Sequence, residues 1–98
     1  MNFEEIHPNI IPSGEASVRS NRHHFTVTLR NQDSTRAQSG ELVCSVVDWN
    51  DDSRRWESNQ PVELGPGEVV SMSVWVSVPQ EMVDEPVWID MAVFGKER

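Results

Sequence analysis

Apolar and polar residues alternate with a period of two along much of this chain, and this pattern predicts β-strands. In residues 23–31, HHFTVTLRN, the apolar side chains Phe25, Val27 and Leu29 alternate with polar ones. Such a strand buries one face and leaves the other in water. Residues 69–78, VVSMSVWVSV, repeat the alternation, with Trp75 on the serine-rich face. No window has the spacing of a good helix, so we expect an all-β protein.

Other segments complete the predicted set of strands. Residues 42–49, LVCSVVDW, are apolar on both faces and suit a central strand. Residues 87–94, VWIDMAVF, follow Pro86 and should form the last strand. Weaker candidates lie at residues 16–20, at residues 2–6, and as a short edge strand at residues 55–57 within a polar loop. Five to seven strands without crossover helices predict an antiparallel two-sheet sandwich.

A tight turn should precede the long strand that starts at Val69. In LGPGE, residues 64–68, Pro66 presets the backbone and Gly67 supplies the positive φ of a type II turn. The chain has 98 residues, the usual size of one domain. We therefore expect a single domain over residues 1–98, with residues 1–14 as an extended N-terminal segment or an edge strand.

Residues 25–49, 62–79 and 87–95 carry a resemblance to a known group of domains. FTVTLRNQDSTRAQSGELVCSVVDW, VELGPGEVVSMSVWVSVP and VWIDMAVFG resemble bacterial and archaeal Ig-like modules of the CARDB and fibronectin type III sort. The resemblance covers about residues 23–95, and it implies an Ig-like sandwich of about seven strands with a non-catalytic spacer, adhesion or assembly role. Such modules have a further strand after the equivalent of residues 87–94, where this sequence has only GKER. The last strand is therefore expected to be an open edge, unless the N-terminal segment or a second chain covers it.

The net charge of −8 narrows the classes of partner. A nucleic-acid-binding protein normally carries the opposite sign, so we expect no direct nucleic-acid binding and a protein partner or a homo-oligomer instead. Neither a signal peptide nor a membrane-length apolar run is visible in the sequence. We expect a soluble protein, cytoplasmic if the chain is complete, and extracellular or on the cell surface if it is a domain of a longer protein.

Candidate metal sites in the sequence are incomplete. Asp48, Asn50 and Asp52 occupy the first alternate positions of an EF-hand-like loop, but Ser53 replaces the required glycine and Asn59 the bidentate glutamate. His7, His23, His24 and Cys44 could ligate zinc, but adjacent residues of a strand point to opposite faces. We expect a solvated acidic turn, a surface pair of histidines, His23 and His24, at the start of a strand, and no metal or other cofactor.

Catalytic signatures are also missing from the sequence. There is no nucleophile elbow around a serine, no signature around Cys44 and no glycine-rich phosphate loop. Paired carboxylates at Asp51 and Asp52 lie beside Arg54 and Arg55, which would keep them ionised. We therefore expect no enzymatic activity and no catalytic residues.

Several aromatic residues fall out of phase with the predicted core. Trp88 and Phe94 point away from the core in the last strand, and Trp75 does so in the long strand. Val43, Val47 and Trp49 do so in the middle strand. Coverage by the chain's own loops or N-terminal segment, by a second copy or partner, or by stacked sugar rings would each explain such a stripe. Trp75 should lie on the opposite outer face from Trp88 and could be covered by an arginine of the SRRW stretch.

These observations lead to a functional hypothesis. We expect a non-catalytic protein interaction or assembly module that acts through the outward aromatic face and an open last strand. The interaction residues would be Trp49, Val47, Trp88, Phe94 and Trp75. One alternative is a small acidic inhibitor, of the kind some phages encode, that mimics nucleic acid by presenting clustered carboxylates, and a further alternative is a carbohydrate-binding module.

Overall fold

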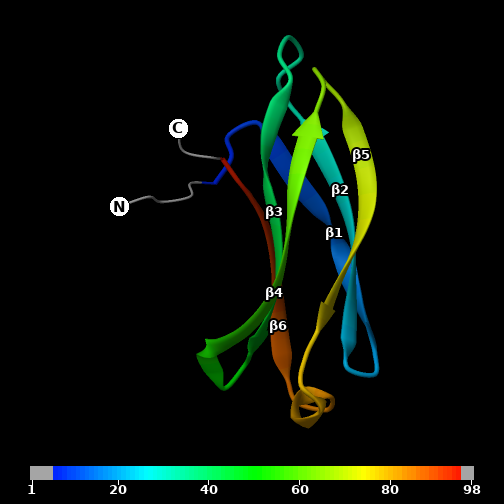
Figure 1. The fold of residues 1–98 in the computed structure, drawn as a ribbon, viewed down its shortest axis with the longest axis vertical. Helices are drawn as coiled ribbons and strands as arrows, with labels where there is room; N and C mark the ends of the chain where they lie inside the picture. Colours follow the sequence, from blue (N-terminus) through cyan, green and yellow to red (C-terminus); the bar gives the residue numbers. More distant parts are fainter. Residues whose placement is uncertain (1–5, 96–98) are drawn as a thin grey trace.

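Two antiparallel three-stranded sheets face each other in the computed structural model, which describes residues 6–95 (Figure 1). Sheet one has the order β1-β2-β5, and sheet two has the order β4-β3-β6. A single 3₁₀ turn, η1, joins β5 to β6. The elements are β1 (Ile10–Arg19), β2 (Arg22–Asn31), β3 (Gln38–Asp48), β4 (Asp51–Leu64), β5 (Val69–Ser77), η1 (Gln80–Met82) and β6 (Val87–Phe94).

The expected all-β architecture with two antiparallel sheets is therefore confirmed. Six strands lie within the described residues. The candidate strand at residues 2–6 falls outside them except for Ile6, which forms an isolated bridge to Phe94. The predicted total of about seven strands consequently stays a prediction.

Two strands are longer than the sequence pattern indicated. The polar stretch expected to be a loop with a short strand at residues 55–57 is the 14-residue strand β4, which pairs with β3 from Arg55 to Leu64. Pro61 is tolerated there because β4 is an edge strand of sheet two. β1 begins at Ile10 and pairs with β2 along its whole length, so residues 10–14 of the expected N-terminal segment are strand. In both cases a regular neighbour supplies a hydrogen-bonding edge that weak local propensity does not reveal.

The predicted turn before β5 is present. The Glu68 N–H donates to the Gly65 carbonyl at 3.1 Å, and Gly67 has a φ of 66°. These are the features of a type II turn with Pro66 and Gly67 at its centre.

The core lies between the two sheets and follows the predicted alternation. Phe25, Val27 and Leu29 of β2 are fully buried, and Val74 and Val76 of β5 are nearly so. The serines that alternate with the valines in β5 are exposed. From sheet two the buried apolar core residues are Leu42, Cys44, Val46, Val62, Leu64 and Val93.

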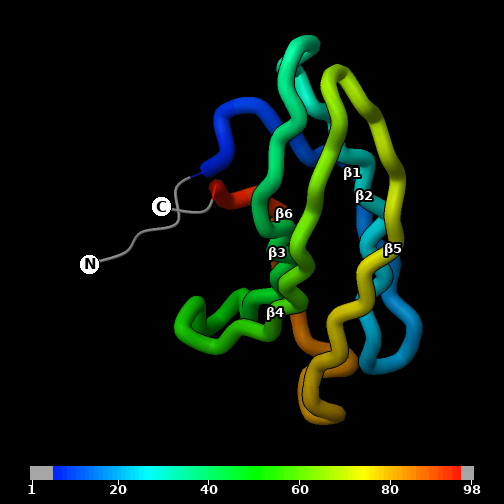
Figure 2. Tube along the Cα trace, turned by 45° about the horizontal axis from the view of Figure 1, so that its top comes forward, coloured from blue at the N-terminus to red at the C-terminus, as the bar shows by residue number. Residues whose placement is uncertain are grey.

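The β3–β4 hairpin departs from the flat sandwich at its turn. The register between β3 and β4 shifts between Val47 and Asp48, so Asp48 pairs with Asp51 whereas Val47 pairs with Arg55. The tip of this hairpin bends away from sheet one, as both views show in green (Figures 1 and 2). The bend places the hairpin tip beside the start of β6, where the Trp49 N–H donates to the Pro86 carbonyl at 3.1 Å.

Candidate functional site: the open edge of β6 and the Trp49–Trp88 pocket

β6 is an edge strand of sheet two, and its backbone groups alternate between two sides. The Pro86 carbonyl accepts a hydrogen bond from the β3–β4 turn, whereas the Val93 carbonyl accepts one from His7 N–H at 2.7 Å on the opposite side. Because both backbone groups of a residue in an antiparallel strand face the same side, Val87, Ile89 and Met91 share the side of Val93. Among residues 6–95, no strand pairs with this side of β6 over residues 87–92.

Of the N-terminal residues that the structure describes, Ile6 and His7 cover the C-terminal end of β6. Ile6 bridges to Phe94, and the next residue bonds to Val93. The His7 ring then fixes the path into β1, because its Nδ1 accepts the N–H groups of Asn9 and Ile10 at 3.0 and 3.2 Å. The chain turns away into sheet one at that point, so no residue from Ile6 to Asn9 pairs with β6 over residues 87–92.

Apolar side chains that face the interior are exposed at this open side. Ile89 lies opposite Val46 of β3 on the inner face of sheet two, yet it is 38% exposed. Val18 lies opposite His23 on the inner face of sheet one, yet it is 57% exposed. β1 and β6 are edges of the two sheets, and they contact each other on the same side of the sandwich. The interior is incompletely closed between them.

The outer face of sheet two holds four of the five interaction residues expected from the sequence. Val47 is fully buried, because its cross-strand neighbours are the long side chains of Arg55 and Trp88. Phe94 is half-buried beside Ile6. Trp88 is 39% exposed and Trp49 is 66% exposed. The exposed part of the aromatic stripe is thus narrower than the sequence pattern indicated.

An open pocket of about 500 Å³ joins the two exposed tryptophans. It is lined by Trp49 and Trp88 together with Asn50, Asp51 and Asp52 of the hairpin tip. Both tryptophans were expected from the sequence pattern to be interaction residues, but the pattern did not associate them with these acids. The association comes from the register shift and bend of the β3–β4 hairpin, which no periodic pattern signals.

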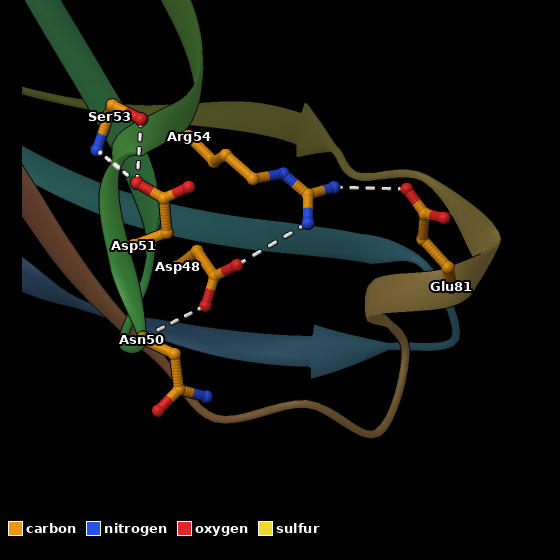
Figure 3. Close-up of polar contacts among 6 residues, drawn as sticks. All are labelled: Asp48, Asn50, Asp51, Ser53, Arg54 and Glu81. Carbon is orange, nitrogen blue, oxygen red and sulfur yellow. Dashed lines mark hydrogen bonds and ion pairs between the residues drawn. The ribbon is translucent and has the colours of Figure 1, made fainter.

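Hydrogen bonds within the hairpin fix the side chains that resemble a calcium loop (Figure 3). Asp48 accepts the Asn50 N–H at 2.9 Å through Oδ1, and its Oδ2 lies 3.5 Å from Arg54. Arg54 also bonds to Glu81 of η1 at 3.0 Å. Asp51 accepts the hydroxyl and the N–H of Ser53 at 2.6 and 3.1 Å. These hydrogen bonds hold the pKa of the Asp51 carboxyl below its usual range.

Trp75 lies on the outer face of sheet one, opposite to Trp88 as expected. The Arg22 guanidinium lies 4.3 Å from the centre of its ring, and the His24 ring stacks on it at 4.3 Å with an angle of 17°. The expectation that the SRRW stretch covers Trp75 is wrong: Arg54 lies over Trp56 instead, at 5.5 Å. The cross-strand pairing of His24 with Trp75 could not be foreseen without the register of β2 and β5.

The candidate metal ligands are dispersed. His23 and His24 point to opposite faces of β2, and His7 precedes β1 with its Nδ1 already bonded. Cys44 is fully buried in the core, where burial, assisted by the charge of Asp90, raises the pKa of its thiol to about 11. No three His, Cys, Asp or Glu side chains between Ile6 and Gly95 come together as metal ligands.

Compared with protein-family models, with curated proteins and with solved structures, the chain matches none of them. Within the described part of the chain, no helix is long and apolar enough to cross a membrane.

Proposed function

We propose that this protein is a non-catalytic protein interaction or assembly module that binds an extended segment of a partner along the open edge of β6. The observation that carries the proposal is the unpaired side of β6 at Val87, Ile89 and Met91, within the described residues. An extended segment would satisfy these N–H and C=O groups, and its alternate side chains would give specificity. The partner is another protein or another copy of this one.

The sheet order supports an Ig-like interpretation of the sandwich. With β1-β2-β5 facing β4-β3-β6, β6 occupies the place that a further strand would flank in the modules that the sequence resembles. A strand from a partner would take that place. It would also cover Ile89 and Val18, which are otherwise exposed although they face inward.

The interior chemistry is consistent with a binding role. The one cysteine is buried with a raised pKa, so little of its thiol is in the reactive thiolate form at neutral pH. The three histidines lie on different faces or elements and share no partner group. By contrast, the exposed aromatic and backbone groups at sheet two are of the kinds that bind a partner without catalysing a reaction.

Amide hydrogen exchange, followed residue by residue, tests strand addition. In the free protein, the amides of Val87, Ile89 and Met91 should exchange faster than those of Trp88 and Asp90, which face β3. Capped peptides of about nine residues, alternating valine with threonine, glutamate or arginine, then serve as probes. Methylation of the peptide nitrogens that face away from β6 prevents the peptides from pairing with each other. At least one peptide, or the protein itself at about 100 μM in moderate salt, should slow the three edge amides.

Variants at Ile89 control for adventitious binding. Ile89→Pro removes one N–H on the open side, and Ile89→Lys places an inward charge on the edge while keeping the N–H. Both should abolish the protection, and a thermal melt verifies that each variant is folded. If neither self-association nor any probe peptide slows the edge amides of the wild type, the proposal fails.

A second candidate is the acidic inhibitor of a nucleic-acid-binding protein. Seven acids would form its surface, and all of them lie on sheet two or its adjoining loops: Asp48, Asp51, Asp52, Glu57, Asp84, Glu85 and Asp90. Six of the seven are exposed, and only Asp48 is buried. Asp48 and Glu57, however, are paired with Arg54 and Arg55. Competition with duplex DNA for a basic DNA-binding domain tests this candidate, because a mimic must displace the DNA and a strand-adding module need not.

A further inference from the structure

Tryptophans in this protein differ in whether a cation covers them. Trp75 carries the Arg22 guanidinium at 4.3 Å, and Trp56 carries that of Arg54 at 5.5 Å. Trp49 and Trp88 have no such cation from any residue between Ile6 and Gly95. A cation over an indole face is stabilising, and the pocket between these two rings leaves space for one.

The two carboxylates at this pocket have no cation in direct contact, and only the more distant charge of Arg54 acts on Asp51. Asp51 and Asp52 line it, and neither forms an ion pair with another described residue. Arg54 and Arg55, the nearest cations along the chain, are engaged by Asp48, Glu81 and Glu57. The hydrogen bonds from Ser53 keep the pKa of Asp51 low, so its carboxylate is charged at neutral pH. The pocket thus presents two aromatic rings and two carboxylates, and both kinds of group attract a cation.

We propose that this pocket binds an arginine or lysine side chain of a partner protein, carried by the extended segment that adds to β6. The inference rests on the proposed function. A residue opposite Trp88 in an added strand would lie about 4.5–5.5 Å from it, which lets a long side chain extend over the ring into the pocket. Arginine suits it best, because its planar group stacks on an indole while its N–H groups donate to carboxylates.

A second copy of the chain fits this pocket poorly. β6, VWIDMAVF, contains no lysine or arginine, and pairing it with itself would place Asp90 carboxylates on the same outer face. Each copy also carries a net charge of −8. The complementary segment therefore has apolar residues on its inner side, against Ile89 and Val18, and basic residues on its outer side.

The valine–arginine peptide described above tests the inference, with a valine–citrulline peptide as its matched control. Citrulline keeps the length and hydrogen-bonding shape of arginine but has no charge. The indole N–H signals of the four tryptophans, assigned with single Trp→Phe variants, report where the peptide binds. We expect the arginine peptide to shift the signals of Trp49 and Trp88 and to slow the β6 edge amides. The citrulline peptide should bind at least about tenfold more weakly.

Paired variants separate a specific pocket from general attraction between opposite charges. Trp49→Ser and the double variant Asp51→Asn/Asp52→Asn should each weaken the arginine peptide about tenfold. Glu15→Gln/Glu63→Gln removes the same charge from exposed positions elsewhere and should change the affinity about twofold or less. Thermal melts confirm that each variant is folded.

The outcomes distinguish this inference from the proposed function. Two results would show that strand addition is right and the cation-binding pocket is wrong. One is that the citrulline, threonine or glutamate peptide protects the β6 edge as well as the arginine peptide does. The other is that the protein's own dimer occupies the β6 edge. Equal weakening by the two double carboxylate variants would also overturn the pocket. A shift of the Trp49 and Trp88 signals by neutral oligosaccharides, with no response to the arginine peptide, would replace it with a sugar site. Failure of every peptide and of self-association would overturn the proposed function itself.

Discussion

The outer faces of the two sheets each carry a tryptophan of almost equal exposure, and they differ in how those rings are covered. Trp75 of sheet one is 40% exposed and Trp88 of sheet two is 39% exposed. Trp75 is covered by Arg22 and His24, its neighbours on the adjacent strand β2. Trp88 is instead part of a pocket with acidic residues. Exposure alone therefore does not identify an interaction surface; the surrounding side chains decide whether the ring has a partner within its own chain.

The largest expected effect is a difference in stability between substitutions on the inner and the outer face of sheet one. Val74→Asp should unfold the protein, because a carboxylate without a partner in the core costs several kcal/mol, against a total stability of about 5–15 kcal/mol. Ser73→Asp, the neighbouring outward position, should leave the fold intact. Urea unfolding followed by tryptophan fluorescence measures both. Equal damage from the two substitutions would show that the outer face of sheet one is also covered.

A double-mutant cycle tests whether Trp75 is stabilised within its own sheet. Arg22→Ala and Trp75→Ala should show a coupling of about 0.5–1 kcal/mol in the free energy of unfolding, from the contact between guanidinium and indole. A matched cycle between Arg22 and Trp88, which lie on different sheets, should show no coupling. A null result for the first cycle would remove the basis of the comparison between the two tryptophans.

The inward histidine of sheet one should make stability depend on pH. Burial lowers the pKa of His23 from its usual value of 6.5, so the unfolded state binds more protons as the pH falls through this range. The free energy of unfolding should therefore decrease below about pH 6.5, whereas the lowered carboxyl pKa values of Asp33 and Asp51 act only at more acidic pH. Urea unfolding at several pH values should show a smaller slope for His23→Gln than for the wild type. His24→Gln is the control, since it leaves His23 in place.

The smallest expected effect concerns the inner face of sheet two. Burial is the main cause of the raised pKa of Cys44, and the charge of Asp90 is a lesser one. Asp90→Asn should therefore lower the pKa of Cys44 slightly from about 11, as measured by thiolate absorbance in the ultraviolet. A return of the thiol to its usual pKa of 9.0 would instead indicate that water enters through the open side between β1 and β6.

The sequence alone predicted β2, β5, β6 and the turn at Pro66 and Gly67 well. These segments alternate clearly or contain residues that fix a turn, so local information is sufficient. The lengths of β1 and β4 were underestimated, because polar and proline-containing segments become strands only when a neighbouring strand offers its hydrogen-bonding edge. The sequence could also assign Trp88 and Trp75 to outward faces, since the direction of a side chain in a strand follows from its position.

Only the tertiary structure decided what surrounds those outward residues. The register of β2 against β5 places His24 on Trp75, and the register shift in the β3–β4 hairpin brings Asp51 and Asp52 to Trp88. Both depend on contacts between residues far apart in the sequence, and a one-residue slip would change the face on which each side chain lies. The sequence thus determined which residues point outward, and the pairing of strands determined that Trp75 is covered by Arg22 and His24 while Trp88 lines an open acidic pocket.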